Sequence, residues 1–516
     1  MKRESGWVVF FCGWQALAAA VPAIYDSSFG YRLPGRPECA VWWCEGTYKV
    51  GRERTLPEAT ADRVHLEAAR NEYEPFQLVL YPEQTLTQVK VRVADVWTHS
   101  SEASLVFAAT NVGVRLVDYV PVQAPSDAGG SAGLYPDPLP PPPPALTLEA
   151  RQHQPFWITV YVPKTQPAGL YLGTIEIEAE GWTEPIQVPV QLRVFDFTLP
   201  DFTHTRTLYD VAIPSRWHGP LDETQRAQVW DLYMENFRRH RVSPQWPQRY
   251  APLQWSWGVG QFVYDFADYD RALSRYLDEF GFSSFVFMDE PWTLFGFSRF
   301  QPGYNSLFTL LMSGIAEHLR RKGWMDKACA YWIDEPADSL IPFVQAGMHA
   351  HLYAVPDLKR LLTREPVPEL YGLVDLWVPM AVISIFGNTA DRWFDRMAAD
   401  EEVWWYVCTY PKWPGPNYFI DHPAITHRIR FWLAERYGIH GDLYWDVNWY
   451  LDRQRQPIDP WTQTTVLDES GRPMGNGDGV LLYPPVKTPP DQPVVAGPID
   501  SLRWELIREG LEDREY

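Results

Sequence analysis

Two short segments of the sequence place an aspartate, a glutamate and a proline side by side. They read VFMDEPWT, residues 286–293, and YWIDEPAD, residues 331–338. Neighbouring acids disfavour joint ionisation, so that one of them can stay protonated and act as a general acid. The other, when ionised, can stabilise positive charge that develops on a substrate. Asp334 and Glu335 are therefore our first candidates for catalysis.

The second acid pair follows a predicted strand. ACAYWI, residues 328–333, is an apolar run typical of a buried strand, which puts Asp334 and Glu335 at its carboxyl end. Because a residue before proline avoids the helical region, we expect Glu335 to stay extended there. A structural explanation competes with the catalytic one, since aspartate often caps a helix and proline often opens one. For Asp289 and Glu290 the two explanations, sugar binding and helix capping, both stay open.

The elements that would position these acids follow a repeating order. Beyond residue 205, apolar strands alternate with amphipathic helices, as in RTLYDV followed by ETQRAQVWDLYMENFRRHR. We count about eight strands over residues 205–450, including a short one near RVSPQW, and a last helix over residues 498–515. This order and length predict a (β/α)8 barrel, in which catalytic groups lie at the carboxyl ends of the strands.

The first half of the sequence has a different pattern. Residues 62–195 contain short segments rich in β-branched and aromatic residues, separated by Gly, Pro and Asp, with no helical pattern between them. Such a pattern is typical of an antiparallel β-sandwich. We therefore predict a multidomain chain of class α/β plus β. It has a β-sandwich over residues 40–200 and a barrel, closed by the C-terminal helix, over residues 201–516.

Polar and aromatic side chains recur at the predicted strand ends. Aromatic rings stack on the C–H faces of sugars while their polar edges form hydrogen bonds. We expect a sugar-binding rim around the acid pair, although packing between strands and helices explains about half of the aromatic residues equally well. The candidates are Asp210 on the first strand, Asp289 and Glu290 on the third, Trp405, Tyr406 and Tyr410 on the seventh, and Trp445, Asp446 and Asn448 on the eighth.

The composition excludes several classes of function. With 45 basic and 65 acidic residues the net charge is −20, which argues against nucleic acid or an anionic membrane surface as the main partner. There is no nucleophile-elbow, phosphate-loop, dinucleotide or His-Glu-x-x-His motif, and the 12 histidines form no ligand-like cluster. We therefore expect neither a cofactor nor a metal. The sequence does not indicate an oligomeric state.

The N-terminus has the features of a secretory signal. Residues 1–23 combine a basic start, an apolar stretch and small residues before a cleavage point, which predicts an extracytoplasmic or secreted protein. No other segment is long and apolar enough to cross a membrane. Of the five cysteines, Cys39 and Cys44 are close enough in sequence to form a disulfide, and the other three resemble buried small apolar residues.

Several segments together resemble one known family. They are the strand ending in Asp-Glu-Pro, the last strand LYW…N, the tail SLRWELIREGLEDREY, and ARNEYEPFQLVL and PAGLYLGTIEI in the first half. Over residues 40–516 the chain resembles glycoside hydrolase family 123. The resemblance implies a β-sandwich followed by a barrel, and β-N-acetylgalactosaminidase activity. It also implies substrate-assisted catalysis, in which the sugar's 2-acetamido oxygen attacks the anomeric carbon, Asp334 orients that group and Glu335 is the acid/base.

Three functional hypotheses follow. The first is a retaining exo-hydrolase of β-linked N-acetylhexosamine, with GalNAc as the sugar that the resemblance implies. The second is a glycosidase of the same fold that acts on other glycans with a protein nucleophile such as Glu290. The third is a non-catalytic glycan-binding protein at a cell surface. The pair of Asp334 and Glu335 favours an enzyme, because a binding protein has no need of adjacent acids. In all three the partner is a glycan or glycoconjugate.

Overall fold

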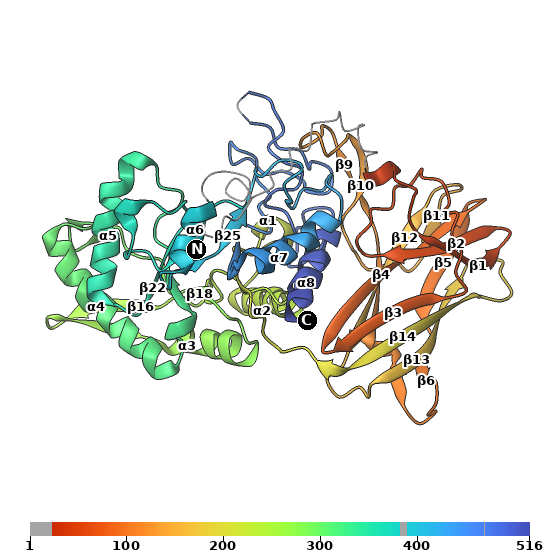
Figure 1. The fold of residues 1–516 in the computed structure, drawn as a ribbon, viewed down its shortest axis with the longest axis horizontal. Coiled ribbons are helices and arrows are strands. Elements are labelled where there is room, and N and C mark those ends of the chain that lie inside the picture. Colours follow the sequence, from red (N-terminus) through yellow and green to blue (C-terminus); the bar gives the residue numbers. More distant parts are fainter. Residues whose placement is uncertain (1–22, 382–389, 469) are drawn as a thin grey trace, which may run out of the picture.

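The computed structural model describes residues 23–381, 390–468 and 470–516. The chain folds into a part made almost entirely of strands, drawn in red to yellow, and a larger α/β part that follows it (Figure 1). The predicted signal, residues 1–23, lies outside the described residues except for Ala23. Within the described ranges no helix combines the length and the apolar character needed to cross a bilayer.

Two sheets form the strand-rich part. Their strand orders are β1-β2-β4-β12-β8 and β11-β5-β13-β14-β3, with β6 and β7 beside β13. The first sheet consists of β1 (Tyr31–Arg36), β2 (Cys39–Glu45), β4 (Glu72–Pro82), β12 (Gln154–Val162) and β8 (Val112–Leu116). The second consists of β11 (Leu146–Leu148), β5 (Leu86–Val93), β13 (Gly169–Glu178), β14 (Ile186–Thr198), β3 (Val64–Arg70), β6 (Val96–His99) and β7 (Val106–Ala108). A hairpin of β9 (Tyr119–Val122) and β10 (Gly133–Pro136) stands beside them.

Apolar side chains from the two sheets meet between them. Phe76 and Leu78 of β4 and Val188 and Val190 of β14 are all buried in one common core. Because side chains of a strand alternate between its faces, this period of two presents one apolar face of each sheet to the other. The predicted strand-rich N-terminal region is thus confirmed, and its two sheets pack face to face.

One pairing differs from the prediction of an antiparallel arrangement. β3 runs parallel to β14, with Val64 opposite Val190, whereas every other pairing within the two sheets is antiparallel among the residues described. The reason lies at Asn71, the single residue between β3 and β4, which has φ +63°. Asparagine tolerates this left-handed conformation better than most residues, so the chain passes here directly from one sheet to the other.

The predicted disulfide does not form. Cys39 and Cys44 are both free and buried. They lie five positions apart on β2, so their side chains point to opposite faces of the sheet. Cys39 belongs to the core between the two sheets, while Cys44 packs outside it with Trp42 and Val79.

The α/β part contains eight short strands and their connecting helices among the described residues. The strands are β15 (Arg206–Tyr209), β18 (Phe285–Val286), β21 (Ala328–Ala330), β22 (Lys359–Leu362), β23 (Leu376–Trp377), β24 (Glu402–Val403), β25 (Trp405–Val407) and β26 (Gly441–Tyr444). The helices are α1 (Ser215–His218), α2 (Glu223–Arg239), α3 (Ala267–Leu273), α4 (Pro302–Lys322), α5 (Ile341–Ala354), α6 (Ala390–Met397), α7 (Ile425–Tyr437) and α8 (Leu502–Glu515). Two hairpins, β16 (Gln254–Gly258) with β17 (Gln261–Asp265) and β19 (Thr293–Leu294) with β20 (Phe297–Ser298), branch from this part.

The eight strands pair in parallel in two groups. The orders are β15-β26-β25 and β18-β21-β22-β23-β24, and β24 is followed after one residue by β25. The predicted strand near residues 241–246 is reduced to a bridge between Pro244 and Tyr209, and the next residue, Gln245, accepts a hydrogen bond from the backbone of Val286 in β18. These contacts link β15 to β18. The α/β class is therefore confirmed, with its parallel pairings.

Helix termini carry the expected local signals. The side chain of Asp222 accepts a hydrogen bond from the backbone N–H of Gln225, and the side chain of Gln225 accepts one from the backbone N–H of Asp222, so a capping box begins α2. α4 begins with a proline at its first position and is followed by Gly323 at φ +74°. A glycine costs least in this left-handed conformation, which ends the helix.

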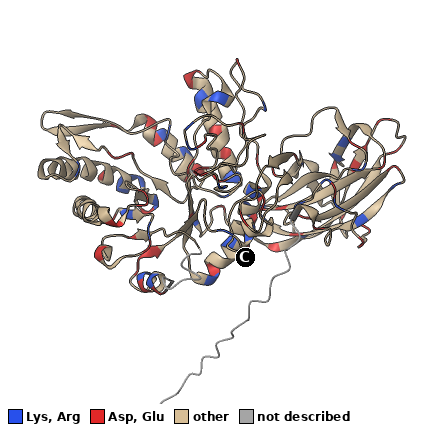
Figure 2. Cartoon of the chain, turned by 90° about the horizontal axis from the view of Figure 1, so that it is seen from above, with Lys and Arg blue, Asp and Glu red and all other residues tan. Residues whose placement is uncertain are grey.

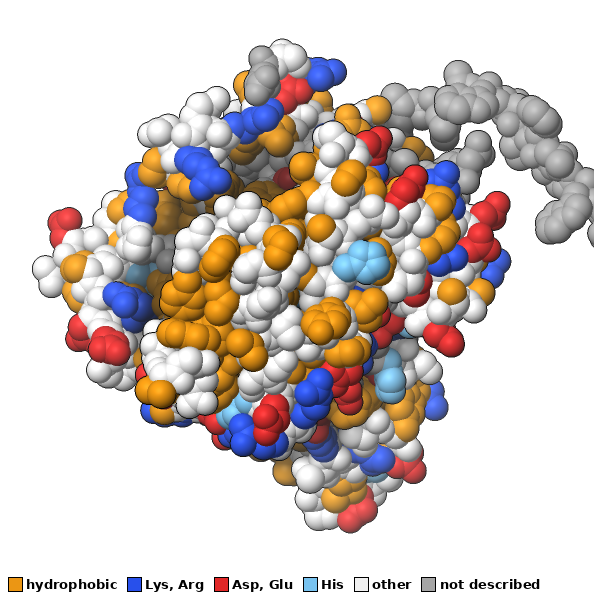
Figure 3. Space-filling model, turned by 90° about the vertical axis from the view of Figure 1, so that its left-hand side faces the viewer, with side chains coloured by type: hydrophobic (Ala, Val, Ile, Leu, Met, Phe, Trp, Pro, Cys, Tyr) orange, Lys and Arg blue, Asp and Glu red, His pale blue; other side chains and the backbone are white. Residues whose placement is uncertain are grey.

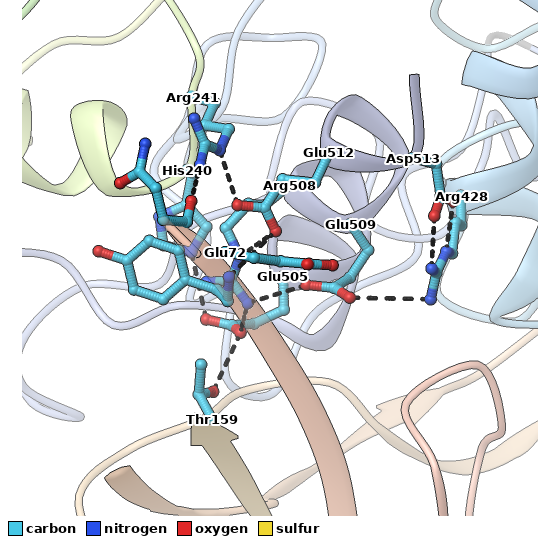
Figure 4. A network of polar contacts seen from close by, with 12 residues as sticks. Glu72, Thr159, His240, Arg241, Arg428, Glu505, Arg508, Glu509, Glu512 and Asp513 are labelled. Carbon is cyan, nitrogen blue, oxygen red and sulfur yellow. Dashed lines mark hydrogen bonds and ion pairs between the residues drawn. The ribbon is translucent and has the colours of Figure 1, made fainter. Parts of the chain in front are cut away.

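The last helix, α8, joins the two parts. Its residues from Leu502 to Glu512 are buried, and Figure 2 shows charged residues of both signs along both parts of the chain. Arg508 forms ion pairs with Glu505 and Glu509, and Glu505 also accepts hydrogen bonds from Trp157 and Thr159 of β12 (Figure 4). A second link is the ion pair of Arg503 with Asp137, which follows β10.

Candidate functional site

The acid pair lies directly beyond the end of β21, as predicted. Asp334 and Glu335 follow three non-strand residues and precede the short 3-10 helix Asp338–Leu340, and both are exposed. Oδ1 of Asp334 accepts hydrogen bonds from the hydroxyl groups of Tyr331, at 2.6 Å, and Thr363, at 2.8 Å. Thr363 is the residue after β22, so two neighbouring strands hold this carboxylate from its two sides.

Glu335 is held by different partners and in an unexpected conformation. Its backbone N–H donates to Oγ1 of Thr363 at 2.9 Å, and Tyr406 of β25 donates its hydroxyl hydrogen to Oε1 of the carboxylate. The prediction that Glu335 is extended is wrong, because its φ is +39°. A left-handed residue other than glycine costs about 1–3 kcal/mol and is found mostly at functional sites. The Thr363 contact helps to keep it there.

The two tyrosines that hold the pair remain protonated donors. Burial, followed by the nearby Asp334 carboxylate, raises the pKa of Tyr331 well above its usual value. Burial and the hydrogen bond to Glu335 likewise raise the pKa of Tyr406. A phenol that keeps its proton can only donate to a carboxylate. Each acid is therefore fixed through one oxygen by a neighbouring hydroxyl group.

A cleft lies next to β18, the strand that pairs with β21. It is a cavity of about 490 Å³ at the carboxyl ends of β15, the 241–246 segment and β18. Its lining consists of Asp210, Trp246, Gln248, Arg249, Pro252, Leu253, Trp255, Phe287, Met288 and Asp289. Trp246 packs in the same apolar cluster as Tyr331 and Tyr406, which hold the acids. This cluster connects the cleft to the tyrosines that hold the acid pair, while Asp334 and Glu335 are not part of the lining.

Two of the predicted sugar-binding residues, Asp210 and Asp289, line this cleft. Asp289 is exposed. Asp210 forms an ion pair with Arg249, which is itself part of the lining. Burial raises the pKa of Asp210, and Arg249 opposes that shift. A carboxylate and a guanidinium side by side offer both an acceptor and donors for sugar hydroxyl groups.

Asp446 and Asn448 are buried below this ion pair. Burial, followed by the charge of Asp210, raises the pKa of Asp446 well above its usual value. The Asp446 carboxylate accepts the backbone N–H of Asn448 at 2.7 Å. The amide of Asn448 bonds to both backbone groups of Ala212. These contacts hold the loop after β15 in place, so Asp446 and Asn448 support the part of the site that contains Asp210.

Glu290 is placed differently from Glu335 despite the repeated motif. Its side chain is 2% exposed and forms ion pairs with Arg299, at 2.6 Å, and His351, at 2.8 Å. Both partners are buried as well. A carboxylate that an arginine and a histidine already bind inside the protein is not available to a sugar or to an anomeric carbon. The structure thus gives Glu290 a packing role in place of the predicted contact with substrate.

The predicted aromatic residues divide into inner and outer ones. Successive residues of a strand face opposite sides, so Tyr406 points to Glu335 while Trp405 is buried on the other face, 5.2 Å from the Arg430 guanidinium. Tyr410 is 52% exposed beyond the strand end. Trp445 is half-buried and donates its indole hydrogen to Asp478 at 3.1 Å.

Sequence reasoning missed several residues of the site. Tyr331 and Thr363 sit on predicted strands, and their position near the strand ends was the available signal. Asp478 comes from the insertion between β26 and α8, where no strand pattern points to it. Burial raises its pKa to about 6, while hydrogen bonds from Trp445 and Tyr444 act in the opposite direction. It fixes the orientation of the Trp445 ring at the rim.

One group of side chains has the ligand types of a metal site. His240, Asp500 and Glu505 bring one potential ligand atom each within 4.8 Å of one another. Glu505, however, is already bound by Arg508 and by Trp157, and the group lies at the α8 junction shown in Figure 4. Hydrogen bonds within the chain thus satisfy it, and we assign no metal to it.

Comparisons with known proteins identify the family. Residues 229–516 match the catalytic domain of glycoside hydrolase 123, and residues 46–179 match the glycoside hydrolase 123 N-terminal domain. No curated protein matches the chain. Among solved structures, a family 123 glycoside hydrolase from Clostridium perfringens, described in a study of glycolipid glycan hydrolysis, shares 14% identity at a TM-score of 0.65. The alignment covers 89% of this chain and 84% of that one, and shows a common fold.

Two β-glucuronidases are more distant. The FMN-binding enzyme from Facaelibacterium prausnitzii has 9% identity and a TM-score of 0.29, over 82% of this chain and 59% of that one. β-Glucuronidase 3 from Bacteroides uniformis has 10% identity and a TM-score of 0.27, over 83% and 50%. Scores this low carry no argument. The two domain matches show the family, because the match to the catalytic domain alone spans more than half of the chain. The chain therefore belongs to glycoside hydrolase family 123, and this membership implies glycoside hydrolase activity.

Proposed function

We propose that the protein releases terminal β-linked N-acetylhexosamine, with GalNAc as the preferred sugar, by substrate-assisted retaining catalysis. The observation that carries the proposal is the way in which the adjacent acids are held. Asp334 and Glu335 share Thr363, yet a different tyrosine binds each carboxylate. Adjacent acids oriented by separate donors can address two parts of one ligand, as this mechanism requires.

The fold that we propose for the α/β part is a (β/α)8 barrel. The parallel pairings, the bridge at Pro244 and the hydrogen bond at Gln245 connect each strand to the next, so that the strands form a closed ring. Alternate strand residues also support it. Leu208, Val286 and Leu361 gather in one small cluster, while their sequence neighbours pack against the helices. That separation is expected for the inside and outside of a barrel. The proposed domain boundaries remain residues 40–200 and 201–516.

The proposed reaction has two steps. In the first, the acetamido carbonyl oxygen attacks the anomeric carbon as the glycosidic bond breaks, and Glu335 transfers its proton to the leaving oxygen. The Asp334 carboxylate accepts a hydrogen bond from the acetamido N–H group, and its negative charge offsets the positive charge of the bicyclic oxazolinium. In the second, Glu335 takes a proton from water as the water oxygen attacks the anomeric carbon and the ring of the intermediate opens.

The burial of Glu290 bears on the alternative mechanism. A glycosidase with a protein nucleophile needs a second carboxylate exposed to the anomeric carbon, about 5–5.5 Å from the acid. Glu290 was the predicted candidate, and its ion pairs with Arg299 and His351 leave it inside the protein. The substrate's own acetamido oxygen needs no such residue. The solved relative was studied for glycolipid glycan hydrolysis, so we include a glycolipid among the substrates to be tested.

Four aryl β-glycosides, those of GalNAc, GlcNAc, galactose and glucose, test the proposal. The GalNAc glycoside should be cleaved fastest, and the galactoside, which lacks the acetamido group, hardly at all. Glu335→Gln should slow glycosides with poor leaving groups about 10²–10⁴-fold and activated aryl glycosides much less. Asp334→Asn should lower kcat with a smaller change in binding. Equal turnover of the galactoside and the GalNAc glycoside would refute the mechanism.

We also propose that the protein is exported, on the basis of its N-terminal sequence. Residues 1–23 have the order of basic, apolar and small residues that secretory signals share. A glycosidase outside the cytoplasm would meet glycoconjugate substrates at surfaces.

A further inference from the structure

Two hairpins project from the rim of the cleft. Pro252, Leu253 and Trp255, at the base of the β16–β17 hairpin, line the cleft, and the β19–β20 hairpin begins four residues after the lining residue Asp289. The ring of Trp257 on the first hairpin lies 5.6 Å from that of Phe295 on the second. The two hairpins are therefore in contact, and they form one surface that continues from the cleft.

Both hairpins expose apolar side chains. Val259 at the first tip is 104% exposed, and Phe295 at the second is 55% exposed. The other exposed members of this surface, here called the hairpin patch, are Trp257, Val263, Trp292 and Phe297. Figure 1 places β16 at the end of the molecule away from the sandwich, and Figure 3 shows hydrophobic side chains gathered on that end. Exposed apolar patches of this kind mark interaction sites.

The backbone conformation at the two tips is unfavourable for the apolar residues found there. In each hairpin two residues separate the last paired ones, and both have positive φ: Val259 (+51°) with Gly260 (+78°), and Phe295 (+50°) with Gly296 (+86°). Turns of this shape strongly prefer asparagine, aspartate or glycine at the first position. Valine, which is β-branched, is among the worst residues for it. Stability of the turn therefore does not account for Val259 or for Phe295.

The hairpin patch also lacks charge. Residues 250–264 and residues 291–298 contain no Asp, Glu, Lys or Arg, in a chain with a net charge of −20. An interface with a basic or acidic partner would place complementary charges at its rim. A surface that enters the apolar boundary of a bilayer must instead be free of charged side chains, because each charge there would have to be desolvated. Tryptophan and phenylalanine are the side chains that membrane-surface segments use for this contact.

We propose that the hairpin patch docks on the surface of an uncharged lipid bilayer, with Val259 and Phe295 inserted at the two tips. The net charge of −20 excludes anionic lipid as the attracting partner, so the contact is apolar and independent of salt. Docking there would bring the mouth of the cleft to carbohydrate carried on that surface. This inference goes beyond the proposed sugar specificity, since lipid binding is measured without turnover.

Co-flotation of the full chain with phosphatidylcholine vesicles tests the proposal. We expect binding that is equal at low and high salt, and about tenfold weaker binding for each of Val259→Asn and Phe295→Asn, from the lost apolar area. Asparagine suits a positive φ, so Val259→Asn should unfold at the same or a higher temperature than the parent chain. Val96→Asn, an equally apolar exposed residue on β6 of the sandwich, is the matched control and should bind like the parent.

Three results would overturn the docking proposal. The first is absence of the chain from the floated vesicles. The second is binding that requires anionic lipid and disappears in high salt. The third is a dimer, seen by sedimentation, that Val259→Asn and Phe295→Asn abolish while vesicle binding is absent, since the hairpin patch would then contact a second copy. Turnover of soluble aryl glycosides by Val259→Asn should equal that of the parent chain, which separates this test from that of the proposed function.

Discussion

Replacing Arg503 by methionine should destabilise the protein strongly. Arg503 and Asp137 are both 0% exposed and are joined by two parallel hydrogen bonds of 2.9 and 2.8 Å. The remaining donors of Arg503 reach the backbone carbonyls of Tyr418, Gly477 and Val480. Burial alone would lower the pKa of Arg503, but the charge of Asp137 reverses the effect and raises it. The guanidinium is thus charged and fully bound.

The expected loss follows from what the substitution leaves behind. Arg503→Met removes the cation that binds Asp137 and leaves this carboxylate with a hydrogen bond from the neutral hydroxyl group of Tyr483. An uncompensated buried charge costs about 3–5 kcal/mol. Asp137→Asn should cost a similar amount, because it leaves the Arg503 guanidinium charged and buried and turns an amide nitrogen toward one of its donors. Replacing both residues by apolar ones should recover part of the loss, and the three carbonyls that stay unpaired set the remainder.

Urea unfolding followed by tryptophan fluorescence measures these differences. Arg320 and Asp357 provide the matched control, since they form the same two parallel hydrogen bonds, at 2.8 and 2.5 Å, on the surface with nearly half of each side chain exposed. Arg320→Met should change the free energy of unfolding by about 1 kcal/mol or less. The reasoning fails if either Arg503→Met or Asp137→Asn costs no more than Arg320→Met.

Three further outcomes are expected. Tyr406→Phe, which removes the donor to Glu335, should lower kcat/KM about tenfold or more with little change in unfolding temperature, and unchanged kinetics would show that this hydrogen bond is dispensable. Burial, with a neighbouring carboxylate, raises the pKa of Glu72 from 4.5 to about 8. The contribution of protonated Glu72 to the stability of the folded protein is therefore full below pH 4.5 and lost as the pH rises through about 8. Melting curves across that range should show the decline, and Glu72→Gln should flatten it; a parallel decline in the variant would place the cause elsewhere. Mass spectrometry of the protein from its native host should find an N-terminus near Ile24 or Tyr25, and a chain that still begins at residue 1 would contradict the predicted signal.

The sequence located the acid pair but could not distinguish it from its copy. Both Asp-Glu-Pro segments follow buried strands, and the difference lies in His351, which binds Glu290 from 61 positions away. Such a contact between distant segments leaves no local pattern. In the same way the left-handed φ of Glu335 depends on Thr363 in the next strand, so the local rule for residues before proline gave the wrong conformation.

The sequence pattern predicted where the strands lie, but it did not predict which side of the strand each side chain faces. The run from Glu402 to Tyr410 is apolar on both faces, as parallel strands between helices and a core usually are. A pattern without alternation cannot tell which residues point inward. Trp405 and Tyr406 were therefore equal candidates, and the pairing of β25 with β26 decided between them. The role of Asp478 was beyond prediction, because its insertion has no repeating pattern to anchor it.

The position of α8 in the chain has a consequence for biosynthesis. A ribosome makes this helix after every element that it binds. Its partners on β12 and α2 and directly after β10 were made some 260 to 370 positions earlier, as for Asn236 with Trp504 (268) and Asp137 with Arg503 (366). Contacts this distant in sequence are slow to form. Until then the nascent sandwich exposes the surface on which α8 will lie, and truncated products keep it exposed. A protease or chaperone that recognises this surface would thus discriminate incomplete chains from finished ones.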